Sequence, residues 1–166
     1  GFNVSMRDTR GRALAGKPAV KELPALRARN ISVVCAMSRN GIVHYVSRTR
    51  AINKEFFVSF IDELHDKLEE KLITNAILIL DNVAFHKSYE VKQKIESYGY
   101  KIMYLPPYSP FLNPIENMFA QWKQITKRAN PNNETELMHT IETGATLITS
   151  ADCENYYKHM WTYLPL

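Results

Sequence analysis

The sequence lacks the features of secreted and membrane proteins. No unbroken apolar run exceeds five residues, as in 76–80, whereas a membrane-spanning helix needs about 20. The chain does not open with the charged and then apolar pattern of a secretory signal. Its two cysteines, Cys35 and Cys153, are too few for a disulfide framework and form no CxxC pair. We therefore expect an intracellular protein with no membrane partner.

Glycine and proline are also sparse. The 166 residues include 6 Gly and 8 Pro, and 45% of them are hydrophobic. This composition excludes a disordered or collagen-like chain, and the length is that of one domain with a sizeable core. We expect residues 1–166 to form that single domain. Because the sequence begins with Gly1 rather than methionine, we also expect it to be part of a longer protein.

Acidic residues are scarce in the first third of the chain. Residues 1–50 hold ten Lys or Arg and two acids, whereas residues 51–166 have a net charge of −4. Eight of the ten cations are arginine, whose planar fork suits phosphate. A solvated basic surface and a nucleic-acid interface both fit this imbalance, and the arginines favour the interface. The candidate DNA contacts are Arg7, Arg10 and Arg12, and on a later helix Lys123 and Lys127.

The hydrophobic periodicity predicts an α/β fold. Alternation around Asn40-Gly41 indicates an antiparallel hairpin, with a turn whose central positions need positive φ. Apolar residues three and four apart indicate amphipathic helices, and short apolar runs indicate strands. The run at 76–80 has the composition of a strand buried on both faces. The expected order is strands at 31–37 and 42–46, a helix at 54–71 after Asn53, a strand at 76–80, a helix from Ser88 to Tyr98, a strand at 100–105, a helix after Asn113-Pro114, and helices at 134–148 and 150–163.

Two carboxylates stand at positions suited to chemistry. Asp81 follows the strand at 76–80, at the edge where open α/β sheets bind ligands. It could instead cap the next turn, which is the commoner role of an isolated Asp-Asn after a strand. Glu116 is the third residue after Asn113, so it could cap the backbone of that residue. A Glu in a first helical turn is also favoured as the ionised, metal-binding form.

The pair is more informative than either acid. Asp81 and Glu116 are separated by 34 residues, which form a helix, a strand and a proline-rich loop. That path can return the second acid to the end of the first strand. Paired carboxylates without a Cys or His cluster suit hard cations, Mg²⁺ or Mn²⁺. Two such ions about 4 Å apart can activate water and stabilise the leaving oxygen in phosphodiester cleavage.

Three stretches resemble the catalytic domain of mariner-type DDE transposases. They are GFNVSMRDTRGRALAGKPA (1–19), LILDNVAFHKS (78–88) and YLPPYSPFLNPIENMFAQWK (104–123). The resemblance implies an RNase H-like mixed sheet flanked by helices. It also implies a cut-and-paste recombinase whose three carboxylates hold two Mg²⁺ or Mn²⁺ ions. By motif, Asp81 is the second acid and Glu116 the third, Asn82 and His86 are adjacent to the site, and Asn113 and Pro114 shape the loop that delivers Glu116.

The sequence departs from the family pattern at the first acid. In this family the first Asp lies in a short acidic motif just upstream of a Gly-Phe like Gly1-Phe2, so here it falls before the first residue. Asp8 lies among arginines and is expected to pair with them. The expected domain therefore lacks the first strand with its Asp, as well as the family's upstream helix-turn-helix region. The chain alone is then expected to be inactive.

Three functions remain open at this level. The first is a DNA transposase core that hydrolyses and rejoins DNA at transposon ends. The second is a catalytically incomplete or domesticated DNA-binding module, and the third is a structure-selective nuclease on the same fold. The resemblance implies DNA as the partner rather than a small-molecule substrate, a homodimer, and a nuclear location if the host is eukaryotic.

Overall fold

The computed structural model describes residues 1–4, 6, 15–17 and 30–164. The predicted order of strands and helices is confirmed to within a few residues at each end. No helix among the described residues is both long and apolar enough to cross a membrane. The elements are β1 (Ser32–Ser38), β2 (Gly41–Arg48), α1 (Lys54–Glu70), β3 (Ile77–Leu80), the 3-10 helix η1 (Ala84–Lys87), α2 (Tyr89–Ser97), β4 (Lys101–Tyr104), the 3-10 helix η2 (Pro110–Leu112), α3 (Pro114–Ala129), α4 (Glu134–Thr146) and α5 (Ser150–Trp161).

Strands β1 and β2 form the predicted antiparallel hairpin. Ser38 pairs with Gly41, so Arg39 and Asn40 make the turn. The expected turn centred on Asn40 and Gly41 is wrong in detail: Gly41 has a φ of 134°, and the described non-glycine residues with positive φ do not include Asn40. The glycine therefore starts the return strand, in a conformation that residues with a Cβ rarely adopt.

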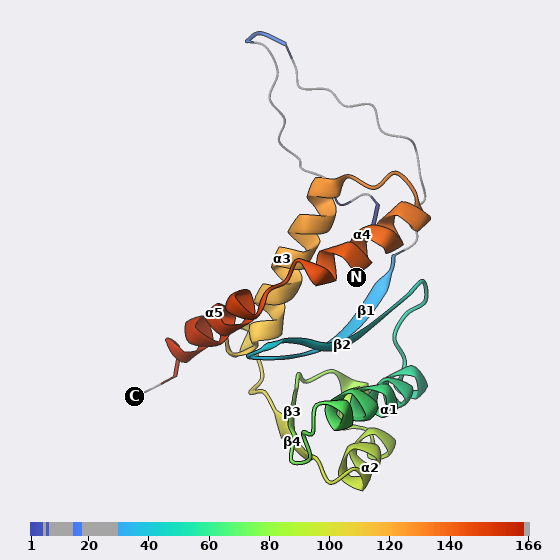
Figure 1. The fold of residues 1–166 in the computed structure, drawn as a ribbon, viewed down its shortest axis with the longest axis vertical. Helices are drawn as coiled ribbons and strands as arrows, with labels where there is room; N and C mark the ends of the chain where they lie inside the picture. The colour runs from blue at the N-terminus through green and yellow to red at the C-terminus, as the bar shows by residue number, and fades with distance from the viewer. Residues whose placement is uncertain (5, 7–14, 18–29, 165–166) are drawn as a thin grey trace.

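The hairpin separates two hydrophobic cores (Figure 1). Side chains alternate across a strand, so Val33 and Cys35 contact the core made with α3, α4 and α5, whereas Val34 and Ala36 contact the core made with α1 and α2. One apolar strand thus serves both layers. The first core consists of Phe2, Val4, Ile31, Met118, Trp122, Leu137, Ile141, Ala145, Ile148 and Cys153.

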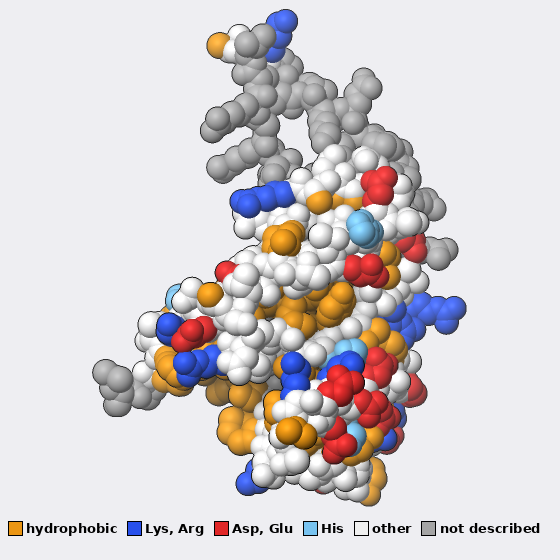
Figure 2. All heavy atoms as spheres, in the orientation of Figure 1, with side chains coloured by type: hydrophobic (Ala, Val, Ile, Leu, Met, Phe, Trp, Pro, Cys, Tyr) orange, Lys and Arg blue, Asp and Glu red, His pale blue; other side chains and the backbone are white. Residues whose placement is uncertain are grey.

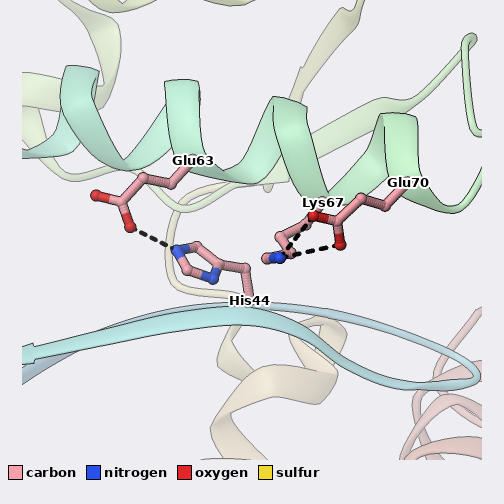
Figure 3. Close-up of polar contacts among 4 residues, drawn as sticks. All are labelled: His44, Glu63, Lys67 and Glu70. Carbon is pink, nitrogen blue, oxygen red and sulfur yellow. Dashed lines mark hydrogen bonds and ion pairs between the residues drawn. The ribbon is translucent and has the colours of Figure 1, made fainter.

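A polar contact adds to the packing of β2 against α1. His44 Nε2 lies 2.9 Å from Glu63 Oε2, and the His44 ring stacks on Phe60 with centroids 5.3 Å apart. Figure 3 shows His44 reaching from the strand to Glu63, while Lys67 pairs with Glu70 within the helix. Asn53 caps this helix as predicted, since its side chain accepts from the Phe56 N–H at 3.1 Å.

Strands β3 and β4 form a separate parallel pair. Ile77 to Leu80 align with Lys101 to Tyr104. The expectation that the 76–80 strand is buried on both faces is wrong, because Ile77 and Ile79 are 54% and 53% exposed. Among the described residues β3 has β4 as its one strand neighbour, and β1 has β2, so each of the two strands keeps one edge without a partner strand.

Trp122 fixes α3 within the first core, as its place on the apolar stripe predicts. The side chain is fully buried, and its Nε1 donates a 2.9 Å hydrogen bond to the Ile141 carbonyl of α4. Phe2 and Tyr45 meet its ring edge-on, with centroids 5.5 and 5.1 Å away. Helix α4 packs tightly on α3 at Gly144, where an added Cβ would lie 2.8 Å from the Trp122 indole.

We expect Gly144→Ala to lower the free energy of unfolding by about 1–3 kcal/mol, the usual cost of overpacking a core. Alanine raises helix propensity by up to about 1 kcal/mol over glycine, and the clash with Trp122 outweighs that gain. Urea unfolding followed by tryptophan fluorescence measures the change. Thr143→Ala is the control, since Thr143 is exposed on the same helix and its substitution should be neutral or stabilising. Equal stability of the two variants would contradict the tight packing at Gly144.

Candidate active site

Asp81 lies directly after β3, and one oxygen of its carboxylate is engaged by the chain. Oδ1 accepts from the Val83 N–H at 3.3 Å and lies 2.7 Å from His86 Nδ1. The first contact is the turn-capping role expected of an Asp-Asn after a strand. No described residue places a donor on Oδ2. The capping and ligand-binding roles therefore use different oxygens and do not exclude each other.

His86 and the backbone hold the Asp81 carboxylate in its ionised form. The contact with His86 is the main cause that lowers the pKa of Asp81, and the Val83 N–H adds to it, against partial burial that raises it. The His86 ring packs on Phe57 with centroids 4.4 Å apart, and its side chain is 13% exposed. The Tyr104 hydroxyl donates to the His86 carbonyl at 2.9 Å. His86 is thus fixed from two sides and presents one ring nitrogen to Asp81.

Glu116 stands in the first turn of α3, and the capping role considered for it is wrong. The Asn113 N–H donates to the Pro110 carbonyl at 3.0 Å instead of to Glu116. Asn113 occupies the N-cap position without a side-chain capping bond, so the cap expected of its side chain is also absent. Pro114 starts the helix as predicted. The Glu116 carboxylate is exposed and has no hydrogen bond or ion pair with any described residue.

One cavity brings the predicted residues together. It has a volume of about 390 Å³, and Asp81, His86, Asn113, Pro114 and Glu116 all line it. Its remaining walls are largely apolar and include β1 and β3. The described residues contain no cluster of three or more metal-ligating side chains. Carboxylate oxygens are the donors that hard cations such as Mg²⁺ and Mn²⁺ prefer, so the donor chemistry of Asp81 and Glu116 fits these ions.

Three of the other predicted residues are described by the structure, and none of them lines this cavity. Asn82 does not line it, and its amide donates to the Leu105 carbonyl at 2.6 Å, which joins the ends of β3 and β4. Lys123 and Lys127 fall seven and eleven positions after Glu116, on the same face of α3. Arg7, Arg10 and Arg12 lie outside the described residues.

The start of the chain pairs with the residue that precedes β1, a contact that the sequence patterns did not predict. Phe2 and Ile31 form an antiparallel bridge, with N–H to carbonyl distances of 2.7 and 2.8 Å. Phe2 is fully buried, and its ring packs against Trp122 of α3, the helix that carries Glu116. The first residues therefore pack against the helix that carries Glu116. The signal in the sequence was the resemblance to the family, which puts the first Asp just upstream of Gly1-Phe2.

Three comparisons place this geometry among known proteins. Residues 1–138 match the family described as DDE superfamily endonuclease. The Homo sapiens histone-lysine N-methyltransferase SETMAR is 28% identical over 124 residues, which are 66% of this chain and 18% of SETMAR. A Mos1 transposase paired-end complex with the left transposon end has a TM-score of 0.73 and 16% identity, over 94% of this chain and 47% of that chain. A Mos1 catalytic domain with Raltegravir and Mg has a TM-score of 0.66 and 15% identity, over 78% and 68%.

The structural likeness confirms the expected RNase H-like α/β fold. The chain spans under half of the length of the matched Mos1 paired-end chain and under a fifth of SETMAR.

We expect His86→Ala to raise the pKa of Asp81 toward its ordinary value of 3.8, because the main contact that favours the carboxylate is lost. Carbon-13 NMR titration of the Asp81 carboxyl measures the midpoint in each protein. His44→Ala is the matched control, since His44 contacts a different carboxylate, that of Glu63. An unchanged Asp81 midpoint in His86→Ala would show that His86 does not stabilise the ionised form.

Proposed function

The chain belongs to the DDE superfamily endonucleases as a mariner-type transposase domain, and on that premise we propose that it is the catalytic core of a DNA transposase. It would cut the phosphodiester backbone at transposon ends and direct the freed 3′-hydroxyl to target DNA. One observation carries the proposal. Asp81 and Glu116 are far apart in the sequence but line one cavity, and each has at least one carboxylate oxygen that no described residue engages.

We further propose Mg²⁺ or Mn²⁺ as the cofactor, with Asp81 Oδ2 and Glu116 as ligands. Two bound ions would lower the pKa of a bound water and stabilise the leaving oxygen. Mos1 structures with Mg and with Mn support this choice of metal. His86 would hold Asp81 in one orientation, since it occupies Oδ1 and leaves Oδ2 directed elsewhere. Lys123 and Lys127, on the Glu116 face of α3, would bind phosphates of the DNA.

The third carboxylate would come from a strand that precedes Gly1 in the parent protein. The bridge between Phe2 and Ile31 is antiparallel, and Ile31 leads directly into β1. A chain that continues this ladder upstream of Gly1 would run along the free edge of β1, beside Val33 to Met37. The cavity lies there, between β1 and β3. Such a strand would therefore end beside Asp81 and carry the first Asp into the site.

We propose DNA as the partner, because one matched Mos1 structure is a paired-end complex with the left transposon end. A homodimer and a nuclear location in a eukaryotic host remain parts of the same proposal. The alternative is a catalytically incomplete, domesticated DNA-binding module, which shares the fold and the basic residues and lacks the completed acid triad.

We expect DNA nicking in Mn²⁺ to require both acids and the upstream segment. The test compares this chain with a form extended upstream by the parent's own residues, on labelled transposon-end DNA. The extended form should nick DNA and this chain should not. Asp81→Ala and Glu116→Ala in the extended form should each reduce nicking by more than about 100-fold, beyond the loss typical of residues that only support a metal site.

Asp66→Ala provides the control, because it removes a carboxylate from α1 away from the cavity. Its nicking rate should match that of the extended wild type. Intact DNA in every reaction, with measurable DNA binding, would overturn the enzyme proposal and favour the DNA-binding module.

A further inference from the structure

A second hollow lies on the other side of the Glu116 helix, between α3 and α5. Its volume is about 590 Å³, and it is open to solvent. The lining is mostly amide and cationic, and no acidic side chain belongs to it. The residues that line it, called the amide groove below, are Asn117, Ala120, Gln121, Gln124, Ile125, Arg128, Asn155, Tyr156 and His159.

Several polar side chains of the amide groove have no partner among the described residues. Asn117, Gln124 and Asn155 make no side-chain hydrogen bond to any described residue, and Arg128 forms no ion pair with one. Gln121 differs from them, since its side-chain amide oxygen accepts a hydrogen bond from the Tyr156 hydroxyl. Donors that converge on a hollow without an internal partner remain available to a ligand.

The groove and the active site share helix α3. Asn117 follows Glu116 in the chain, and Gln124 and Arg128 lie seven and eleven positions further along the same face of α3. The rise of a helix puts Arg128 about 16 Å from Asn117 along the axis. This distance corresponds to about five base pairs of a B-form duplex.

Aromatic side chains extend the groove at the end of α5. The His159 ring meets the Tyr163 ring edge-on at 5.2 Å, and Tyr163 contacts Phe111 at 5.2 Å. Phe111 and Tyr163 are 46% and 49% exposed, so neither is a core residue. Aromatic faces next to cationic and amide donors are typical of surfaces that bind nucleic-acid strands.

The surface charge favours this face for a polyanion. Figure 2 shows acidic side chains gathered over α1 and α2, which lie beyond the hairpin from α3 (Figure 1). Asp152 is the acid that contacts a groove residue, and its carboxylate is already held by Thr149 and by Gln121. A phosphate backbone in the groove would therefore meet amide donors and the Arg128 guanidinium, which has no ion pair with a described residue.

We propose that the amide groove binds the DNA strand that flanks the phosphodiester at Glu116, with Arg128 on a phosphate. This inference rests on the proposed function for its choice of ligand. It adds a binding surface on the α3 and α5 side, distinct from the cavity that holds the carboxylates.

The test measures binding of this chain to a fluorescent duplex, and to a single strand of the same length, by anisotropy in EDTA. We expect Arg128→Gln to weaken binding about 3–10-fold and to reduce the slope of log K against log salt by about 0.9 for the duplex or about 0.7 for the single strand. Lys158→Gln is the matched control. Lys158 lies on α5, is 60% exposed and is absent from the groove lining, so binding should stay within twofold.

Asn117→Ala tests the groove without a change of charge, and we expect it to weaken binding with an unaltered salt slope. Arg128→Gln and Lys158→Gln with equal affinities and slopes would overturn the proposal. Because EDTA removes metal, this result is independent of cleavage. If Arg128→Gln does not weaken binding but the extended form still nicks DNA, the groove proposal fails and the transposase proposal stands. If Arg128→Gln weakens binding but no nicking is seen, the DNA-binding module is favoured.

Discussion

The hydrogen bond from Trp122 Nε1 to the Ile141 carbonyl lies inside the core, and the place of α3 depends on it. A buried indole N–H without an acceptor would cost free energy of folding. This bond and the packing around it therefore fix the rotation of the helix about its axis and its position along that axis. Glu116 lies on the same helix, and Phe2 packs on the same ring. One side chain therefore sets the position of a candidate metal ligand and of the chain segment that enters beside it.

The two acids illustrate how a site can keep its ligands available. An Asp after a strand and a Glu in a first helical turn are usually engaged by the local backbone, and here that engagement is limited. Asp81 gives one oxygen to the turn and to His86 and keeps the other. Glu116 gives none, because Pro110 accepts the Asn113 N–H that it would have capped. The proline-rich loop thus satisfies its own backbone, and the carboxylate remains free for chemistry.

Local patterns predicted the elements well, because periodicity and capping act over a few residues. The helix after Asn53, the start at Pro114 and the core place of Trp122 all follow from spacing. The patterns failed where the outcome depends on distant chain segments. The run at 76–80 has the composition of a central strand, yet its Leu78 and Leu80 pack on the core with α1 and α2. Ile77 and Ile79 lie on the opposite face and are exposed. The amide groove could not be predicted from the sequence either, since α3 and α5 meet through tertiary packing alone.

The mismatch at β3 and the bridge at Phe2 have a common explanation. A strand with the composition of a sheet centre is half exposed, the neighbouring strand β1 has a free edge, and an apolar cavity lies between them. Phe2 pairs in antiparallel register with Ile31, the residue before β1. A single further strand would pair both free edges, cover part of the exposed apolar surface and join the two small sheets into one. The same strand would bring its side chains next to Asp81, so completion of the fold and completion of the carboxylate site would be one event.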